Sequence, residues 1–136
     1  MISSNRLDQI FNSTTLDDIF PPERADLFFD ALLGDATEGA YDIRLIFQKA
    51  ESNILRFAFE LHERPGKCLV CSLTYGLPHV FSRHPVINVK NIVDHIQEKI
   101  TEQANITGWS LDRTIQLDKT IHVIPLLITL DHPIAL

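Results

Sequence analysis

Apolar and polar residues alternate along two neighbouring stretches in the first half of the chain, residues 41–49 and 54–63. The apolar positions are Ile43, Leu45, Phe47, Leu55, Phe57, Phe59 and Leu61. A period of two over this length predicts half-buried strands. The short polar link around residues 51–53 predicts that these two strands form a hairpin.

A turn and a third apolar run follow the hairpin. Residues 64–67 read Arg-Pro-Gly-Lys, with Pro and Gly at the central positions of a type II turn. The run over residues 67–75 then predicts a third strand, which completes an antiparallel meander. Because Pro78 and Pro85 cannot donate to a sheet ladder, we predict a loop over residues 76–85.

Helical spacing dominates residues 88–103, which begin with an asparagine suited to cap a helix. Their apolar stripe is Val89, Ile92, Val93, Ile96 and Ile100, as expected for one buried helix face. An earlier helix is predicted over residues 23–33, after two prolines, with Gly34 as its C-cap. Its apolar stripe is Leu27, Phe28, Ala31 and Leu32. Two short helical turns are predicted before it, over residues 4–11 and 15–20.

The last part of the chain predicts two more strands, residues 109–117 and 120–130. The second of these is nearly all apolar, and a strand that is apolar on both faces lies at the centre of its sheet or in an interface. The elements follow one another in the order α-β-β-β-α-β-β. We therefore predict a single α+β domain over residues 1–136, with helices packed on an antiparallel five-stranded sheet.

This order of elements, with the small size and an acidic pI of about 5.4, is similar to that of the type III secretion chaperones. The resemblance covers most of the chain and implies a dimeric protein that binds other proteins, although the usual third helix after the last strand is missing. Two segments, G-K-C-L-V-C-S-L-T-Y-G-L-P and F-S-R-H-P-V-I-N, also resemble an uncharacterised family of short bacterial proteins. That second resemblance implies no activity.

Composition excludes several classes of partner. The chain has 136 residues, 45% of them apolar, and a net charge of −6. Nucleic acids and anionic membranes attract basic surfaces, but the basic residues here are scattered singly, so we expect neither as a partner. No apolar run approaches the roughly 18 residues of a membrane span, and residues 1–8 show no signal-peptide pattern. We expect a cytoplasmic protein with reduced cysteines.

Both cysteines lie in the predicted third strand, as a single C-x-x-C at Cys68 and Cys71. Thiolates at this spacing can bind zinc or exchange disulfides. A structural zinc site needs four ligands, however, and side chains three apart in a strand point to opposite faces. We therefore interpret both cysteines as buried and inert, keep metal binding and redox chemistry as alternatives, and expect no cofactor.

The predicted loop presents five side chains that are suited to recognition: Tyr75, His79, Phe81, Arg83 and His84. Imidazole, guanidinium and aromatic groups on a rigid loop fit a partner or ligand that is anionic or planar. In the alternative interpretation, Val80 and Phe81 fix the loop to the core, and the polar groups bond to nearby carbonyls or water.

Other polar residues give weaker indications. One group resembles a general acid–base set: Glu60, His62 and Glu63. Cross-strand ion pairing with Arg44 and Arg56 explains that face more simply than catalysis does. The remaining histidines are scattered, and we interpret His122, which interrupts the last apolar strand, as hydrogen-bonded rather than as a metal ligand.

The mean hydropathy of +0.04 is high for so small a chain, which indicates apolar surface covered by a second copy in a two-fold homodimer. The favoured hypothesis is a non-catalytic protein- or peptide-binding domain that presents residues 75–85 and the polar face of the first three strands. The alternative is a small-molecule or metal-binding domain, with or without enzymatic activity, that uses residues 68–85.

Overall fold

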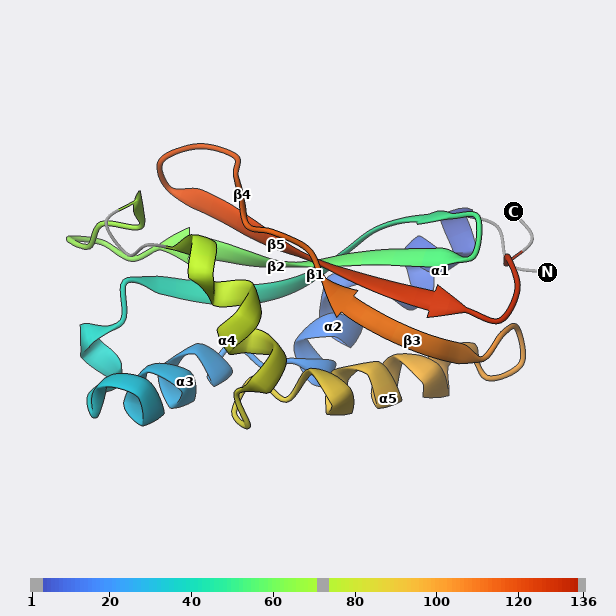
Figure 1. Ribbon diagram of the computed structural model, residues 1–136, viewed down its shortest axis with the longest axis horizontal. Coiled ribbons are helices and arrows are strands. Elements are labelled where there is room, and N and C mark those ends of the chain that lie inside the picture. Colours follow the sequence, from blue (N-terminus) through green and yellow to red (C-terminus); the bar gives the residue numbers. More distant parts are fainter. Residues whose placement is uncertain (1–3, 71–73, 135–136) are drawn as a thin grey trace.

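The computed structural model describes residues 4–70 and 74–134. An antiparallel sheet of five strands forms one layer, and α2, α3, α4 and α5 lie together on one side of it (Figure 1). The α+β prediction is therefore confirmed. The observed element order is longer than predicted, because three helices precede the first strand and two lie between the second and third strands.

The hairpin that the alternation predicted is present. Strand β1 (Tyr41–Glu51) pairs antiparallel with β2 (Ile54–Glu63), with Tyr41 opposite Glu63. Ser52 adopts a φ of 54° in the tight turn between them. Odd-numbered residues of both strands, from Tyr41 to Leu45 and from Leu55 to Leu61, are buried, so the alternation identifies the covered face correctly.

The apolar last strand, β5 (Ile121–Leu130), lies at the centre of the sheet. It pairs with β2 on one side and with β3 (Ile106–Leu111) and β4 (Ile115–Gln116) on the other. The predicted strand over residues 109–117 is thus divided in two. The cause is Pro125, whose carbonyl accepts the Asp112 N–H at 3.0 Å but which has no N–H to return a bond.

The helices begin close to where the sequence predicted. Helix α1 (Ser4–Ile10) and α2 (Ser13–Ile19) replace the two short helical turns, and α3 (Arg24–Leu33) ends at Gly34, whose φ is 80°. The predicted stripe of α3 is wrong in part. Its buried residues are Ala25, Phe28 and Phe29, whereas Leu27, Ala31 and Leu32 are exposed.

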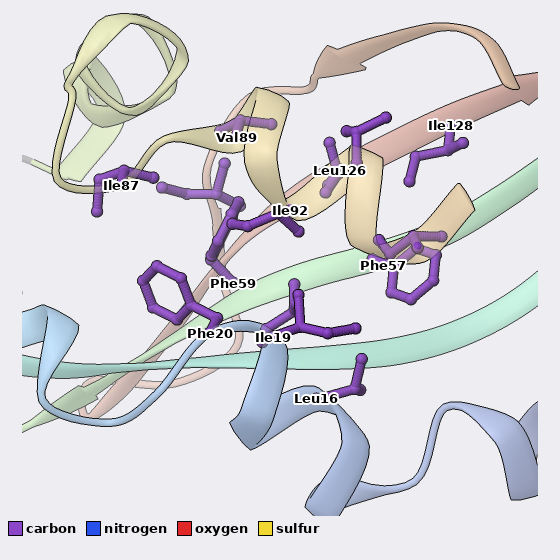
Figure 2. Close-up of a cluster of buried hydrophobic side chains, with 14 of the residues drawn as sticks. Leu16, Ile19, Phe20, Phe57, Phe59, Ile87, Val89, Ile92, Leu126 and Ile128 are labelled. Carbon is purple, nitrogen blue, oxygen red and sulfur yellow. The ribbon is translucent and has the colours of Figure 1, made fainter. Parts of the chain in front are cut away.

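Helix α5 (Val89–Ile100) confirms its predicted stripe in full, since all five apolar residues are buried. Asn88 caps the helix, and its side chain accepts the Asn91 N–H. Figure 2 shows how the core is assembled from α2, α5, β2 and β5, with side chains that point toward one another. Phe59 of β2 lies at its centre and packs edge-on against Phe20 and Phe81.

The predicted third strand and loop are wrong. Residues 67–70 and 74–75 form no strand, and a 3-10 turn, η3 (Thr74–Gly76), leads into a helix, α4 (Leu77–Arg83). Residues 71–73 lie outside the described part of the chain. Pro78 is compatible with the helix because it lies in the first turn of α4, where the backbone N–H has no partner within the helix and its absence breaks no hydrogen bond.

Arg64 ties the end of β2 to the segment that joins α3 and β1. Its guanidinium lies 2.7 Å from Asp26 and 3.0 Å from Asp42, donates to the Ala36 carbonyl, and stacks over the Phe29 ring. The predicted turn that follows is present, since the Lys67 N–H donates to the Arg64 carbonyl and Gly66 has a φ of 76°.

Candidate binding surfaces

Three of the five predicted recognition residues are exposed: Tyr75 in η3, and His79 and Arg83 in α4. His79 and Arg83 are four residues apart, a spacing that puts side chains on one face of a helix. The segment η3–α4 thus presents an aromatic ring, an imidazole and a guanidinium to solvent.

The other two predicted recognition residues contact Phe28. Phe81 is fully buried and packs edge-on against Phe28 and Phe59, so its interpretation as a partner-binding residue is corrected. His84, the residue after α4, is half-buried; its ring lies 4.8 Å from that of Phe28, and its Nδ1 accepts the Val86 N–H. Its role in binding stays a prediction.

A pocket of about 190 Å³ opens between the end of α3, the start of β1 and Leu77, the first residue of α4. Its lining is mainly apolar: Phe29, Leu32, Leu33, Glu38, Ala40, Tyr41 and Leu77. Leu33 is 52% exposed, and Tyr75, two residues before Leu77, is 67% exposed. Burial raises the pKa of Tyr41, so its hydroxyl stays protonated. The pocket suits an apolar side chain, with His79 and Arg83 on the neighbouring helix.

The second candidate surface is the face of the sheet opposite the helices. The register brings even-numbered residues of β1 and β2 and odd-numbered residues of β5 onto this open face. One half is mainly charged: Asp42, Arg44, Arg56, Glu60 and His62. The other half, along β5 and β4, is apolar: Ile115 is exposed, Ile121 and Leu127 are half-buried, and Val123 and Pro125 are buried.

A shallow pocket of about 460 Å³ lies at the edge of the charged half, lined by Asp17, Pro22, Asp42, Ile43, Arg44 and His62. The register puts Arg44 opposite Glu60 as predicted, but Arg44 lies 3.9 Å from Asp17, and Glu60 bonds to His62 at 3.1 Å. Arg44 and Glu60 are therefore neighbours across the hairpin, as predicted, but each side chain interacts with another residue instead.

The suggested acid–base set does not come together. Glu63 accepts the Leu69 N–H at 3.1 Å, which directs its carboxylate toward the 64–70 segment and away from the open face. Arg56 donates to the Gln48 side chain at 3.0 Å. These contacts stabilise the surface of the sheet and leave Glu60 and His62 as a surface pair.

Sequence reasoning missed the partners of His122. Its Nδ1 and the Thr74 hydroxyl are joined by a 2.7 Å hydrogen bond, and the Thr114 hydroxyl donates to the Thr74 carbonyl at 2.7 Å. His122 is only 2% exposed, and burial lowers its pKa, against a smaller opposing effect of Asp118. The prediction that His122 is hydrogen-bonded is confirmed, and the cluster fixes η3 to β5.

The cysteine interpretation is corrected at Cys68, which is exposed and disulfide-bonded rather than buried and reduced. Cys71 lies outside the described residues. Within residues 4–70 and 74–134, no group of three or more His, Cys, Asp or Glu side chains is placed to hold a metal ion. The helices of this same part of the chain are all too short or too polar to cross a bilayer.

No family model, curated protein or solved structure matches the chain. The resemblances to type III secretion chaperones and to short bacterial proteins stay predictions. The function of the chain is therefore inferred from the two surfaces just described.

Proposed function

We propose that this chain is a non-catalytic protein- or peptide-binding domain that acts as a homodimer. The partner docks on the α4 surface, defined here as Tyr75, His79 and Arg83 together with the pocket between α3 and α4. The observation that carries the proposal is the exposure of the large apolar side chains Leu32 and Leu33 at a pocket whose lining includes Leu77, the first residue of the helix that carries His79 and Arg83.

The surface indicates the chemistry of the partner. Apolar side chains grouped at a concave site mark an interaction surface, and an apolar anchor in a pocket is the usual centre of such a contact. On a chain of net charge −6, Arg83 and His79 form a local basic site that attracts a carboxylate. The best partner is therefore a peptide segment with an apolar side chain next to an acidic one.

Addition of a strand to β1 is a less suitable mode of binding. Peptides that bind in this way need free backbone groups along a sheet edge. Ile43 and Leu45, whose backbone groups face away from β2, are each 2% exposed. The first half of β1 is thus covered, and a pocket between helices is the more accessible site.

Selection of a displayed random-peptide library on the full chain tests the proposal. We expect enrichment of peptides that combine an apolar and an acidic residue. In calorimetric titrations with the selected peptide, Leu33→Glu and Arg83→Glu should each weaken binding at least tenfold, which is about 1.4 kcal/mol.

Lys90→Glu supplies a matched control, because Lys90 is exposed on α5 and the substitution makes the same change of charge as Arg83→Glu. It should leave the affinity unchanged. No enrichment, or equal loss of binding in all three variants, would contradict the proposed function.

A further inference from the structure

We infer that the pocket of the α4 surface selects a tyrosine side chain of the bound peptide, and that the hydroxyl of Tyr41 provides this selectivity. The inference rests on the proposed function and narrows its apolar anchor to one type of residue. The size of the pocket, its aromatic wall and one hydroxyl group without a hydrogen-bond partner in the described residues support it.

The pocket has the volume of one substituted ring. A cavity of about 150 Å³ accommodates benzene, and one water molecule takes up about 30 Å³ of the liquid. The volume of about 190 Å³ therefore holds a ring with a hydroxyl group, but not the second ring of an indole. Small-molecule sites usually have about 300–1,000 Å³, so a single side chain is the more suitable occupant.

Two rings in fixed positions form the inner wall of the pocket. Phe29 and Tyr41 meet edge-on, with their centroids 4.8 Å apart, and both are almost fully buried. The Arg64 guanidinium lies over the Phe29 ring, and this ring approaches Gly39 so closely that a Cβ there would collide with it. Aromatic rings favour edge-to-face and offset contacts. Because the wall needs no rearrangement, it is preorganised for a third ring.

The hydroxyl of Tyr41 is the polar group of this wall. Among the described residues it has no hydrogen-bond partner, and Tyr41 as a whole is only 3% exposed. Within the same residues, His122 Nε2 is the one buried side-chain nitrogen or oxygen that is closed off from solvent without a partner. Solvent therefore reaches the Tyr41 hydroxyl. Since Tyr41 lines the pocket, the pocket is the opening that leads to this group.

This hydroxyl distinguishes between the possible occupants of the pocket. A phenylalanine or leucine side chain displaces water from the Tyr41 hydroxyl and offers no hydrogen bond in return, which leaves a buried polar group unpaired and weakens binding. A tyrosine hydroxyl can both donate and accept a hydrogen bond. It therefore pairs with the Tyr41 hydroxyl while its ring packs against the aromatic wall.

The first test of the inference needs no ligand. Tyr41→Phe removes only the hydroxyl, so the urea midpoint of unfolding should be unchanged or higher. Thr74→Val is the matched control, because it removes a buried hydroxyl that is bonded to His122, and it should lower the midpoint. A lower midpoint in Tyr41→Phe as well would show that its hydroxyl is bonded within the chain, and would overturn the inference.

NMR titration of the isotope-labelled chain with p-cresol and toluene, the side chains of tyrosine and phenylalanine, tests the selectivity. The backbone amide signals of Leu33, Ala40 and Leu77 should move with both compounds. The wild type should bind p-cresol about tenfold more tightly than toluene, as expected for one hydroxyl that gains its partner. In Tyr41→Phe the two affinities should be equal. Unmoved signals, or equal affinities in the wild type, would contradict the selectivity.

The selected peptide separates this inference from the proposed function. Replacement of its tyrosine by phenylalanine should weaken binding to the wild type about tenfold and leave binding to Tyr41→Phe unchanged. A peptide that loses affinity in Arg83→Glu, but contains no tyrosine or binds equally well with phenylalanine, would sink the inference and leave the proposed function standing. Selective binding of p-cresol without any enriched peptide would do the reverse.

Discussion

The covered face of the sheet carries large apolar rings and aliphatic side chains, whereas the open face carries charged residues beside a narrower apolar column. On the covered face, Phe57 and Phe59 are fully buried and make edge-on ring contacts with Phe11, Phe20 and Phe81. On the open face, the same strand β2 presents Arg56, Glu60 and His62. One strand therefore buries the side chains of one face in the core and carries charged side chains on the other.

This difference predicts which substitutions should change the free energy of unfolding. A side chain on the covered face has no other environment than the core, so its loss should lower the free energy of unfolding. An exposed side chain on the open face, such as Leu117, meets water in the single chain, so its loss should change the free energy of unfolding little. Three predictions test this division, from the largest expected effect to the smallest.

Phe59→Ala should lower the free energy of unfolding by about 3–5 kcal/mol, the usual cost of removing a buried aromatic ring. Urea denaturation followed by circular dichroism measures it. The matched substitution Leu117→Ala, on the open side at 60% exposure, should change the unfolding free energy of the monomer by less than about 0.5 kcal/mol. Equal effects of the two would contradict the division between the faces.

Arg64→Ala should cost about 1–3 kcal/mol, because it leaves the Ala36 carbonyl without its donor and removes a stacked side chain from Phe29. The carboxylates of Asp26 and Asp42 are largely exposed and regain water, which limits the loss. Arg64→Lys should recover part of the stability, since it keeps the charge. An unchanged denaturation midpoint in Arg64→Ala would show that this contact is not stabilising.

His122 should give the smallest effect, a dependence of stability on pH. Burial lowers its pKa in the folded chain, so the unfolded chain binds a proton first as the pH falls below about 6.5. The free energy of unfolding should therefore decrease below that pH, with a slope of at most about 1.4 kcal/mol per pH unit. His122→Gln keeps a hydrogen-bonding side chain opposite Thr74 and should remove this part of the slope; an identical slope would exclude His122 as the cause.

The fold was predictable wherever a segment had one uniform periodicity. The alternation in residues 54–63 identified β2 to the residue, and the spacing from Val89 to Ile100 identified the buried face of α5. The stripe of α3 failed because the helix buries Ala25, Phe28 and Phe29 and leaves Leu27, Ala31 and Leu32 exposed. The apolar spacing of this helix fits two overlapping faces that both contain Phe28, and the local pattern does not choose between them.

The candidate site was predictable only in part, because a helix was interpreted as a loop. Without helical spacing, nothing separated Tyr75, His79 and Arg83 from Phe81 and His84. In the structure the first three are exposed, Phe81 is buried and His84 is half-buried. Likewise, no local pattern could pair Thr74 with His122, since 48 residues separate them.

Pro125 affects the structure on both sides of the sheet. Because it divides the edge of the sheet into β3 and β4, residues 112–114 are not held in a ladder, and Thr114 turns inward to bond the Thr74 carbonyl. That bond anchors the 3-10 turn from which Tyr75 projects. A single imino acid at the centre of the sheet thus fixes, through Thr114, the turn that leads into α4, so a substitution of Pro125 should alter the start of that helix as well as the edge of the sheet.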